Sequence, residues 1–195
     1  MTEQDKTKQH ELPPDANSAD TLVRDNISWM LVVAQRLLKD RALAEDAVQE
    51  AFLSAFRGLD KFEQRSSLKT WLHRITVNAC LMKLRQLKRL AEQPIDEYLP
   101  EFTRYGCRIE EHWGNLASVE EILNNEQRSA QVHKMINKLP GNYRIVLLLR
   151  DIEGYNTEEV VELLGISESN VKVRLHRARA ALKKLIEPIL RGEIV

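Results

Sequence analysis

The most constraining feature of this sequence is residues 156–179, whose pattern predicts a helix, a tight turn and a second helix. Asn156 or Thr157 is expected to cap the first helix, whose apolar residues share one face: Val160, Val161, Leu163 and Leu164. Gly165 follows where a left-handed residue ends a helix at little steric cost. Ser167 is the expected N-cap of the second helix, because its side-chain oxygen can accept a first-turn N–H. The stretch therefore predicts a helix-turn-helix.

The second helix of this motif is expected to be strongly basic. Between Ser169 and Lys184 the chain has six Lys or Arg residues and no Asp or Glu. Such a helix enters the major groove of DNA, with its N-terminal residues near base edges and further cations on phosphates. The structural alternative is a packing hairpin with a solvated basic face, a common role for charged helices. Pro188 is expected to help stop the helix.

Composition favours an all-α protein of a reducing compartment. The 195 residues include only 7 Gly and 6 Pro, whereas Leu, Ala, Glu, Lys and Arg are abundant. Cys80 and Cys107 are the only cysteines and form no Cys-x-x-Cys pair. No apolar run reaches the roughly 18 residues of a membrane helix, and the N-terminus lacks a signal-peptide hydrophobic region. We expect a cytoplasmic protein with no membrane insertion.

Charge is segregated along the chain although the net charge is zero. Residues 65–91 hold seven basic residues and no acidic one, and residues 92–126 hold nine acidic residues against two basic ones. Such an acidic segment can mimic a nucleic-acid strand in a cationic channel, or it can repel DNA. We expect two small helical domains, at 18–91 and 127–195, joined by an acidic linker at 92–126, after a disordered tail at 1–17.

Three helices are predicted in the first domain. The first runs over 19–38 with Ser18 as its N-cap, the second over 42–58 with Gly58 as its stop, and the third over about 68–90. Trp29 falls off the first stripe, so it is either part of a second packing face, the favoured interpretation, or an exposed contact. The expected buried stripes are Leu22, Val23, Ile27, Met30, Leu31, Ala34 and Leu38, then Val48, Ala51, Phe52, Ala55 and Phe56, then Leu68, Trp71, Leu72, Ile75, Ala79 and Met82.

Two surfaces of this domain suggest binding. Asp46, Gln49 and Glu50 lie one turn apart and can dock on a basic partner, although plain solvation of such a face is the common alternative. The third helix is basic and follows a polar loop, a combination that suits single-stranded or locally opened nucleic acid. A solvated basic face is the alternative there too.

Two blocks of the chain together resemble a known family. Residues 43–52, followed by Phe62, 66–75 and Asn78, resemble conserved region 2 of bacterial sigma factors. Residues 139–155, continuing through 171–179, resemble region 4. Their order, with a short acidic linker and no globular region 3, resembles the extracytoplasmic-function (ECF) group of the sigma-70 family. The resemblance implies a transcription initiation factor that directs core RNA polymerase to promoters.

The resemblance also implies roles for individual residues. Contact with the clamp coiled coil of the polymerase β′ subunit is implied for Asp46, Gln49 and Glu50. Recognition of the −10 element is implied for Gln64, Arg65, Ser66, Ser67, Arg74 and Asn78. For the −35 element, base contacts are implied for Asn170, Lys172, Val173 and His176, and phosphate contacts for Arg174, Arg177 and Arg179. The family often has a small or polar residue at the position of Val173 and an aromatic residue at the position of His176, so this chain departs from the family at both. Further implied partners are promoter DNA, the polymerase β flap and an anti-sigma factor.

Other functions make different demands on the sequence. A dimeric helix-turn-helix regulator acting without polymerase needs a dimerisation element, and no heptad pattern is present. An enzyme or metalloprotein is disfavoured, because the histidines and cysteines form no His-x-x-x-His or Cys-x-x-Cys pair. Cys107 with His112 is the only such cluster of note. No catalytic residue, metal or cofactor is expected. A protein-binding adapter would lack the steep salt dependence of DNA binding.

Overall fold

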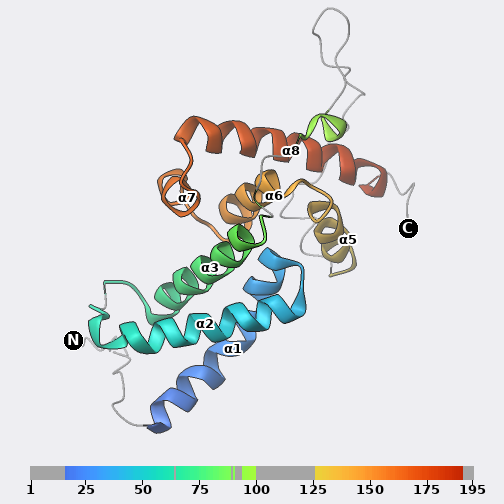
Figure 1. The fold of residues 1–195 in the computed structure, drawn as a ribbon. Helices are drawn as coiled ribbons and strands as arrows, with labels where there is room; N and C mark the ends of the chain where they lie inside the picture. The colour runs from blue at the N-terminus through green and yellow to red at the C-terminus, as the bar shows by residue number, and fades with distance from the viewer. Residues whose placement is uncertain (1–15, 64, 89, 91–93, 100–125, 191–195) are drawn as a thin grey trace, which may run out of the picture. The chain divides into compact units, whose positions relative to one another are not determined.

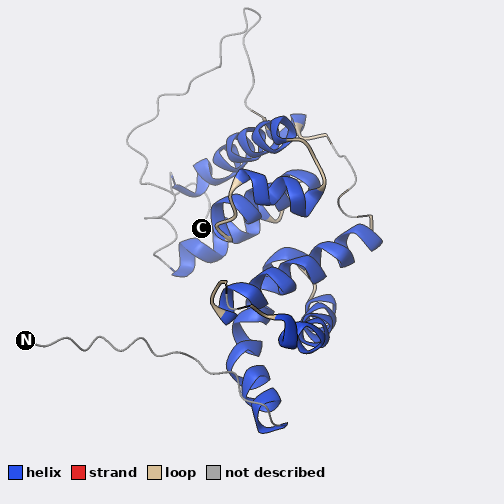
Figure 2. Cartoon of the chain, turned by 90° about the vertical axis from the view of Figure 1, so that its left-hand side faces the viewer, coloured by secondary structure: helices blue, strands red, loops and turns tan. Residues whose placement is uncertain are grey.

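The computed structural model describes residues 16–63, 65–88, 90, 94–99 and 126–190, and all regular structure among them is helical (Figures 1 and 2). The predicted all-α class is therefore confirmed. The chain divides into two compact units, Met1–Cys80 and Leu81–Val195. None of the described helices is long and apolar enough to span a bilayer.

The first unit contains α1 (Ala16–Leu38), α2 (Arg41–Gly58), η1 (Leu59–Lys61) and most of α3 (Leu68–Gln86). α1 and α2 pack against each other across a two-residue connection (Figure 1). Asp40 caps α2 by accepting a hydrogen bond from the Leu43 N–H at 3.0 Å. Apolar side chains line the core of this pair: Met30, Val33, Ala34, Leu37, Leu38, Ala44, Ala47, Val48, Ala51, Phe52 and Ala55.

Several expectations for these helices were wrong in detail. α1 begins at Ala16, so Ser18 lies inside the helix and is not its N-cap. Ile27 and Phe56 are exposed. α3 buries a rotated stripe that includes Leu72, Thr76 and Val77, and it leaves Met82 57% exposed. Thr76 can be buried because its hydroxyl donates to the Leu72 carbonyl at 2.8 Å.

α2 ends at Gly58 as predicted, but for a different reason. The φ of Gly58 is −103°, which any residue adopts, so no left-handed turn is involved. A Cβ at this position would lie 3.3 Å from Cζ2 of Trp71. The Trp71 ring also contacts Phe62, with centroids 4.9 Å apart. Because Gly58 has no side chain, the Trp71 ring can pack closely against the end of α2.

The predicted second packing face at Trp29 is confirmed, because its ring stacks on His73 of α3 with centroids 6.2 Å apart. At its other end α3 stops at Gln86, four residues before the expected boundary. Lys88 adopts a left-handed φ of 51°, and its N–H bonds to the Arg85 carbonyl three residues back. This tightened turn ends the helix.

The second unit is organised around its longest helix. It contains η2 (Asp96–Tyr98), α5 (Glu126–Ile136), α6 (Gly141–Leu147), η3 (Leu148–Ile152), α7 (Thr157–Leu164) and α8 (Glu168–Leu190). α8 packs on α5, α6, α7 and η2. The expectation that Pro188 stops α8 was wrong, because the helix continues to Leu190. The buried Leu182 and Ile186 hold this last part of α8 in place although Pro188 donates no backbone hydrogen bond.

Most of the expected acidic linker, with Cys107 and His112, lies outside the described residues. The part that is described belongs to the second unit. Ile95 is fully buried, and Lys184 of α8 donates to the Leu99 carbonyl at 3.0 Å. Residues 95–99 are therefore attached to α8.

Candidate nucleic-acid interface

α7 and α8 form the predicted helix-turn-helix, and its local geometry follows from the residues at the helix ends. Asn156 caps α7, since its Oδ1 accepts from the Glu159 N–H at 2.8 Å and Glu159 Oε2 accepts from the Asn156 N–H at 2.9 Å. Gly165 ends α7 in the left-handed conformation, at φ 66° and ψ 36°. Ser167 caps α8, with its hydroxyl 3.3 Å from the Asn170 N–H. These predicted caps and this turn are confirmed.

α8 has one buried face and one open face. Val171, Leu175 and Ala178 are buried against the rest of the unit. Most of the residues expected at the −35 element are exposed on the other side of the helix: Asn170, Lys172, Val173, His176 and Arg177. Arg174 is half-buried at the edge of the packed face. The helix thus offers a continuous row of polar, basic and methyl-bearing groups, which are the types that read base edges.

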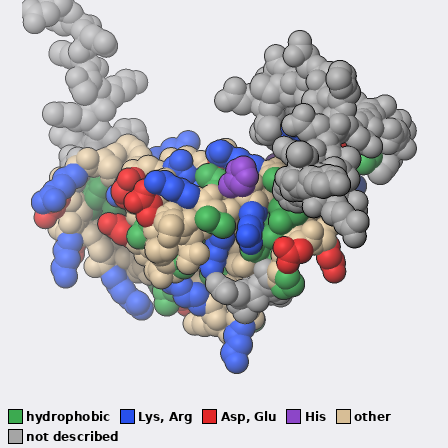
Figure 3. Space-filling model, turned by 90° about the horizontal axis from the view of Figure 1, so that it is seen from above, with side chains coloured by type: hydrophobic (Ala, Val, Ile, Leu, Met, Phe, Trp, Pro, Cys, Tyr) green, Lys and Arg blue, Asp and Glu red, His purple; other side chains and the backbone are tan. Residues whose placement is uncertain are grey.

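Acidic side chains neutralise part of this basic helix. Lys172 forms an ion pair with Glu168, one turn earlier on α8. The hydrogen bond to Glu168, and then its charge, raise the pKa of the Lys172 ammonium. The spacing Glu at i and Lys at i+4 is the sequence pattern that could have predicted this pair. Figure 3 shows basic and acidic side chains intermixed on the face viewed from above.

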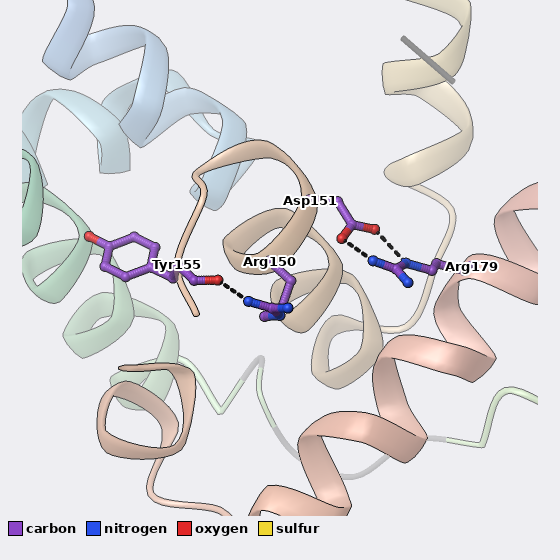
Figure 4. A network of polar contacts seen from close by, with 4 residues as sticks. All are labelled: Arg150, Asp151, Tyr155 and Arg179. Carbon is purple, nitrogen blue, oxygen red and sulfur yellow. Dashed lines mark hydrogen bonds and ion pairs between the residues drawn. The ribbon is translucent and has the colours of Figure 1, made fainter. Parts of the chain in front are cut away.

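A second ion pair joins α8 to η3. The Arg179 guanidinium donates from Nε to one Asp151 oxygen at 2.8 Å and from a terminal nitrogen to the other at 2.6 Å (Figure 4). These hydrogen bonds raise the pKa of Arg179. Arg179 was expected to contact DNA, and no partner within the protein was predicted for it. No local pattern could have done so, because the residues are 28 positions apart.

The expected −10 surface consists of the start of α3 and the loop before it. Gln64 lies outside the described residues, and Arg65 pairs with Glu63 at 2.5 Å. Ser67 is the N-cap of α3, because its hydroxyl accepts from the Thr70 N–H at 3.1 Å. The neighbouring Ser66 is exposed. The loop thus contributes a cap to the fold as well as exposed polar groups.

The open face of α3 continues from this loop. Arg74 and Asn78 are both exposed and lie one turn apart. Lys69, in the first turn, places its Nζ 5.8 Å from the centre of the Trp29 ring. A strand of nucleic acid laid along this face would meet a cation and an amide in succession.

The expected polymerase-binding residues share one exposed face of α2. Asp46, Gln49 and Glu50 are all exposed, and Leu53 extends the same face by one turn. Leu53 is 48% exposed, although it is a large apolar residue. Leu53 was not predicted to belong to this surface, although its spacing from Glu50 and Gln49 places it on this face.

Two family models match the chain. The model described as "Sigma-70 region 2" matches residues 22–90, and the model described as "Sigma-70, region 4" matches residues 129–182. These segments contain the surfaces on α2, α3 and α8 described above. The two blocks of resemblance in the sequence therefore correspond to two recognised family domains.

Individual relatives agree with the family models. The RNA polymerase sigma-H factor of Pseudomonas aeruginosa is 30% identical over 91% of this chain and 90% of its own length. The ECF RNA polymerase sigma-E factor of Escherichia coli is 31% identical over 75% of each chain. The ECF RNA polymerase sigma factor SigM of Mycobacterium tuberculosis is 34% identical over 73% of this chain, which spans 64% of that relative.

Solved structures show a similar fold. The sigma factor RpoE of Bartonella quintana, solved with the anti-sigma factor NepR, superposes with a TM-score of 0.53 at 23% identity, over 86% of this chain and 96% of that one. CnrH, solved with the cytosolic domain of CnrY, gives a TM-score of 0.50 at 24% identity, over 89% and 90%. By its sequence matches to regions 2 and 4, and to relatives along most of its length, this chain belongs to the ECF group of the sigma-70 family of RNA polymerase sigma factors.

Proposed function

We propose that this chain is a transcription initiation factor that binds core RNA polymerase in the cytoplasm and directs it to promoters with specific −10 and −35 elements. The observation that carries this proposal is the open face of α8, the second helix of a capped helix-turn-helix, in a chain that also has region 2. A dimeric regulator acting without polymerase has no use for a region 2 domain, so the combination favours an initiation factor.

The −35 element is assigned to α8. Asn170, Val173 and His176 are exposed near its N-terminal half and can reach base edges in the major groove. The methyl groups of Val173 suit contact with a thymine methyl, and Asn170 suits adenine. Arg177 is exposed on the same side and suits a backbone phosphate. Lys172 becomes available for DNA when its pair with Glu168 opens.

The −10 element is assigned to α3 and its preceding loop. Melting of the promoter exposes single-stranded bases, which a polar loop can hold while cations follow the backbone. Ser66 and Arg65 supply exposed polar groups in the loop, and Arg74 and Asn78 continue them along α3. Gln64 is included in this proposal by the family resemblance. Because Ser67 already caps α3, its role is to hold the loop in place.

We assign the binding of core polymerase to the exposed face of α2. Asp46 and Glu50 provide negative charge, Gln49 provides an amide, and Leu53 provides an exposed apolar group. A basic partner surface with an apolar group would complement all three properties, and the family resemblance implies the clamp coiled coil of the β′ subunit as that partner. The β flap is the expected contact of the second unit.

Regulation by an anti-sigma factor is part of the proposal. RpoE of Bartonella quintana, which shares this fold, was solved in complex with the anti-sigma factor NepR, and CnrH was solved in complex with the cytosolic domain of CnrY. A partner that covers the surfaces on α2 or α8 would keep this chain from polymerase or promoter.

Run-off transcription tests the function directly. Purified bacterial core polymerase is supplied with fragments of the genome that encodes the chain, with and without the protein. Discrete transcripts that require the protein are the expected result, and their start sites define the two promoter elements. If core polymerase is neither bound nor redirected, the proposed function is wrong.

Charge reversal on α2 separates polymerase binding from DNA binding. The variant Asp46→Lys with Glu50→Lys should bind core polymerase weakly, because two attractive contacts become repulsive. Its affinity for duplex DNA should stay unchanged, since α8 is unaltered. Asp60→Lys, which reverses an exposed carboxylate in η1, is the matched control and should bind core polymerase normally. Loss of both activities in the double variant would indicate unfolding instead.

A further inference from the structure

Arg179 has a partner within the protein, and although its side chain is 57% exposed, it lies nearer to the packed face of α8 than Val173 does. At 3.6 residues per turn, Arg179 lies roughly 80° around the helix from the buried Val171, whereas Val173 lies roughly 160° away. Its immediate neighbours Leu175, one turn earlier, and Ala178 are both buried. Arg179 therefore sits at the edge of the packed face and not at the centre of the open one.

The Arg179 guanidinium forms a bidentate ion pair, one of the strongest interactions between an arginine and a carboxylate. Two N–H groups donate to the two oxygens of Asp151, at 2.8 and 2.6 Å. Such a bidentate pair has a fixed orientation as well as a charge attraction. The Asp151 side chain is only 30% exposed, against 57% for Arg179. The carboxylate is thus the more enclosed partner, and the arginine reaches to it.

Asp151 lies on a turn that backbone hydrogen bonds stabilise. η3 is a single turn of π-helix, in which the Glu153 N–H bonds to the Leu148 carbonyl at 2.9 Å. The Tyr155 N–H bonds to the Leu149 carbonyl at 2.9 Å. From the same turn Arg150 points the other way and donates to the Tyr155 carbonyl, so the two consecutive side chains engage different parts of the unit (Figure 4).

We propose that Arg179 is a positioning residue that holds α8 against η3 through Asp151, and that it does not contact a DNA phosphate. The proposal rests on the proposed function, since it concerns how α8 is presented to the −35 element. It replaces the phosphate contact expected for Arg179 from the family resemblance. Because α8 is long, a small rotation at Arg179 would displace its N-terminal residues from the base edges.

The test measures promoter binding by the holoenzyme as a function of salt. The protein is combined with core polymerase and titrated with a labelled promoter fragment that carries the −35 element. If Arg179 positions α8, Arg179→Ala and Asp151→Ala should each weaken binding, by roughly tenfold, while the slope of log affinity against log salt stays unchanged. The double variant should be no weaker than either single one, since the two side chains act as a unit.

A phosphate contact predicts the opposite pattern. Arg179→Ala would then lower the salt slope by about one, and Asp151→Ala would strengthen binding, because it frees a cation and removes a negative charge near DNA. Either result would overturn the proposal. Arg177→Ala is the matched control, an exposed arginine on the open face whose loss should lower the slope by about one.

A conservative substitution provides an independent readout. Arg179→Lys keeps the positive charge but cannot make two parallel hydrogen bonds to a carboxylate. A positioning role predicts that it binds as weakly as Arg179→Ala, whereas a phosphate contact predicts near-normal binding. Circular dichroism of each full-length variant checks that it is folded. If the unaltered holoenzyme fails to bind promoter DNA in a salt-dependent manner, the proposed function itself fails, which is a different outcome from equal slopes with weakened binding.

Discussion

Replacement of Gly165 by alanine isolates the conformational demand of the turn between α7 and α8. Gly165 has φ 66°, a left-handed conformation that costs an L-residue roughly 1–2 kcal/mol. An added Cβ would meet nothing within 4 Å, so there is no steric clash to add. The hydrogen bond from the Gly165 N–H to the Val161 carbonyl, at 2.8 Å, uses only backbone atoms and is kept. We expect Gly165→Ala to lower the free energy of unfolding by roughly 1–2 kcal/mol.

Differential scanning calorimetry of the full-length protein measures this effect. For a domain of about 60–100 residues, each kcal/mol lowers the melting temperature by roughly 4–8 °C, and only the transition of the second unit should move. Gly165→Asn is the matched control, since asparagine tolerates the left-handed region and should lose much less stability. Equal melting of the alanine variant and the parent protein would refute the reasoning, and so would an asparagine variant as unstable as the alanine one.

Four further substitutions test other parts of the structure. Asn156→Ala removes the N-cap of α7 and should lower stability by about 1 kcal/mol in a denaturant titration; an unchanged midpoint would mean that the cap is not formed. Glu168→Gln releases Lys172 and should strengthen duplex DNA binding, with a salt slope steeper by up to about one; weaker binding would show that the carboxylate itself contacts DNA. Leu72→Ala, at a fully buried site, should cost about 2–5 kcal/mol, whereas Met82→Ala, at an exposed site, should cost far less. Equal losses measured by thermal melting would contradict the observed rotation of α3.

A helix end in this protein was predictable where one side chain and the adjacent backbone are enough to form the cap or the turn. Asn156, Gly165 and Ser167 act at the positions that the sequence indicates, because capping and left-handed turns involve residues within about four positions of one another. Ser18 and Pro188 are exceptions, since α1 starts two residues before Ser18, at Ala16, and α8 continues past Pro188 to Leu190. A capping residue in the sequence shows where a helix can start, but it does not exclude an earlier start.

The buried faces were predicted less well than the helices themselves. α3 has apolar residues around more than one side, so periodicity alone permits several orientations. Its neighbours select the one that buries Leu72 and Val77 and leaves Met82 exposed. The role of Gly58 was likewise misassigned, because the need for a small residue comes from the Trp71 ring, 13 positions later in the chain.

The sequence by itself determined the all-α class, the helix-turn-helix and the open face of α8, because helical periodicity and capping are local properties that each segment carries. It also indicated the acidic face of α2, since residues three and four positions apart share a helix face. Only the tertiary structure decided that Arg179 binds Asp151 and that residues 95–99 attach to α8. Those contacts join segments at least 28 residues apart, and their formation depends on how the helices pack, which no local pattern specifies.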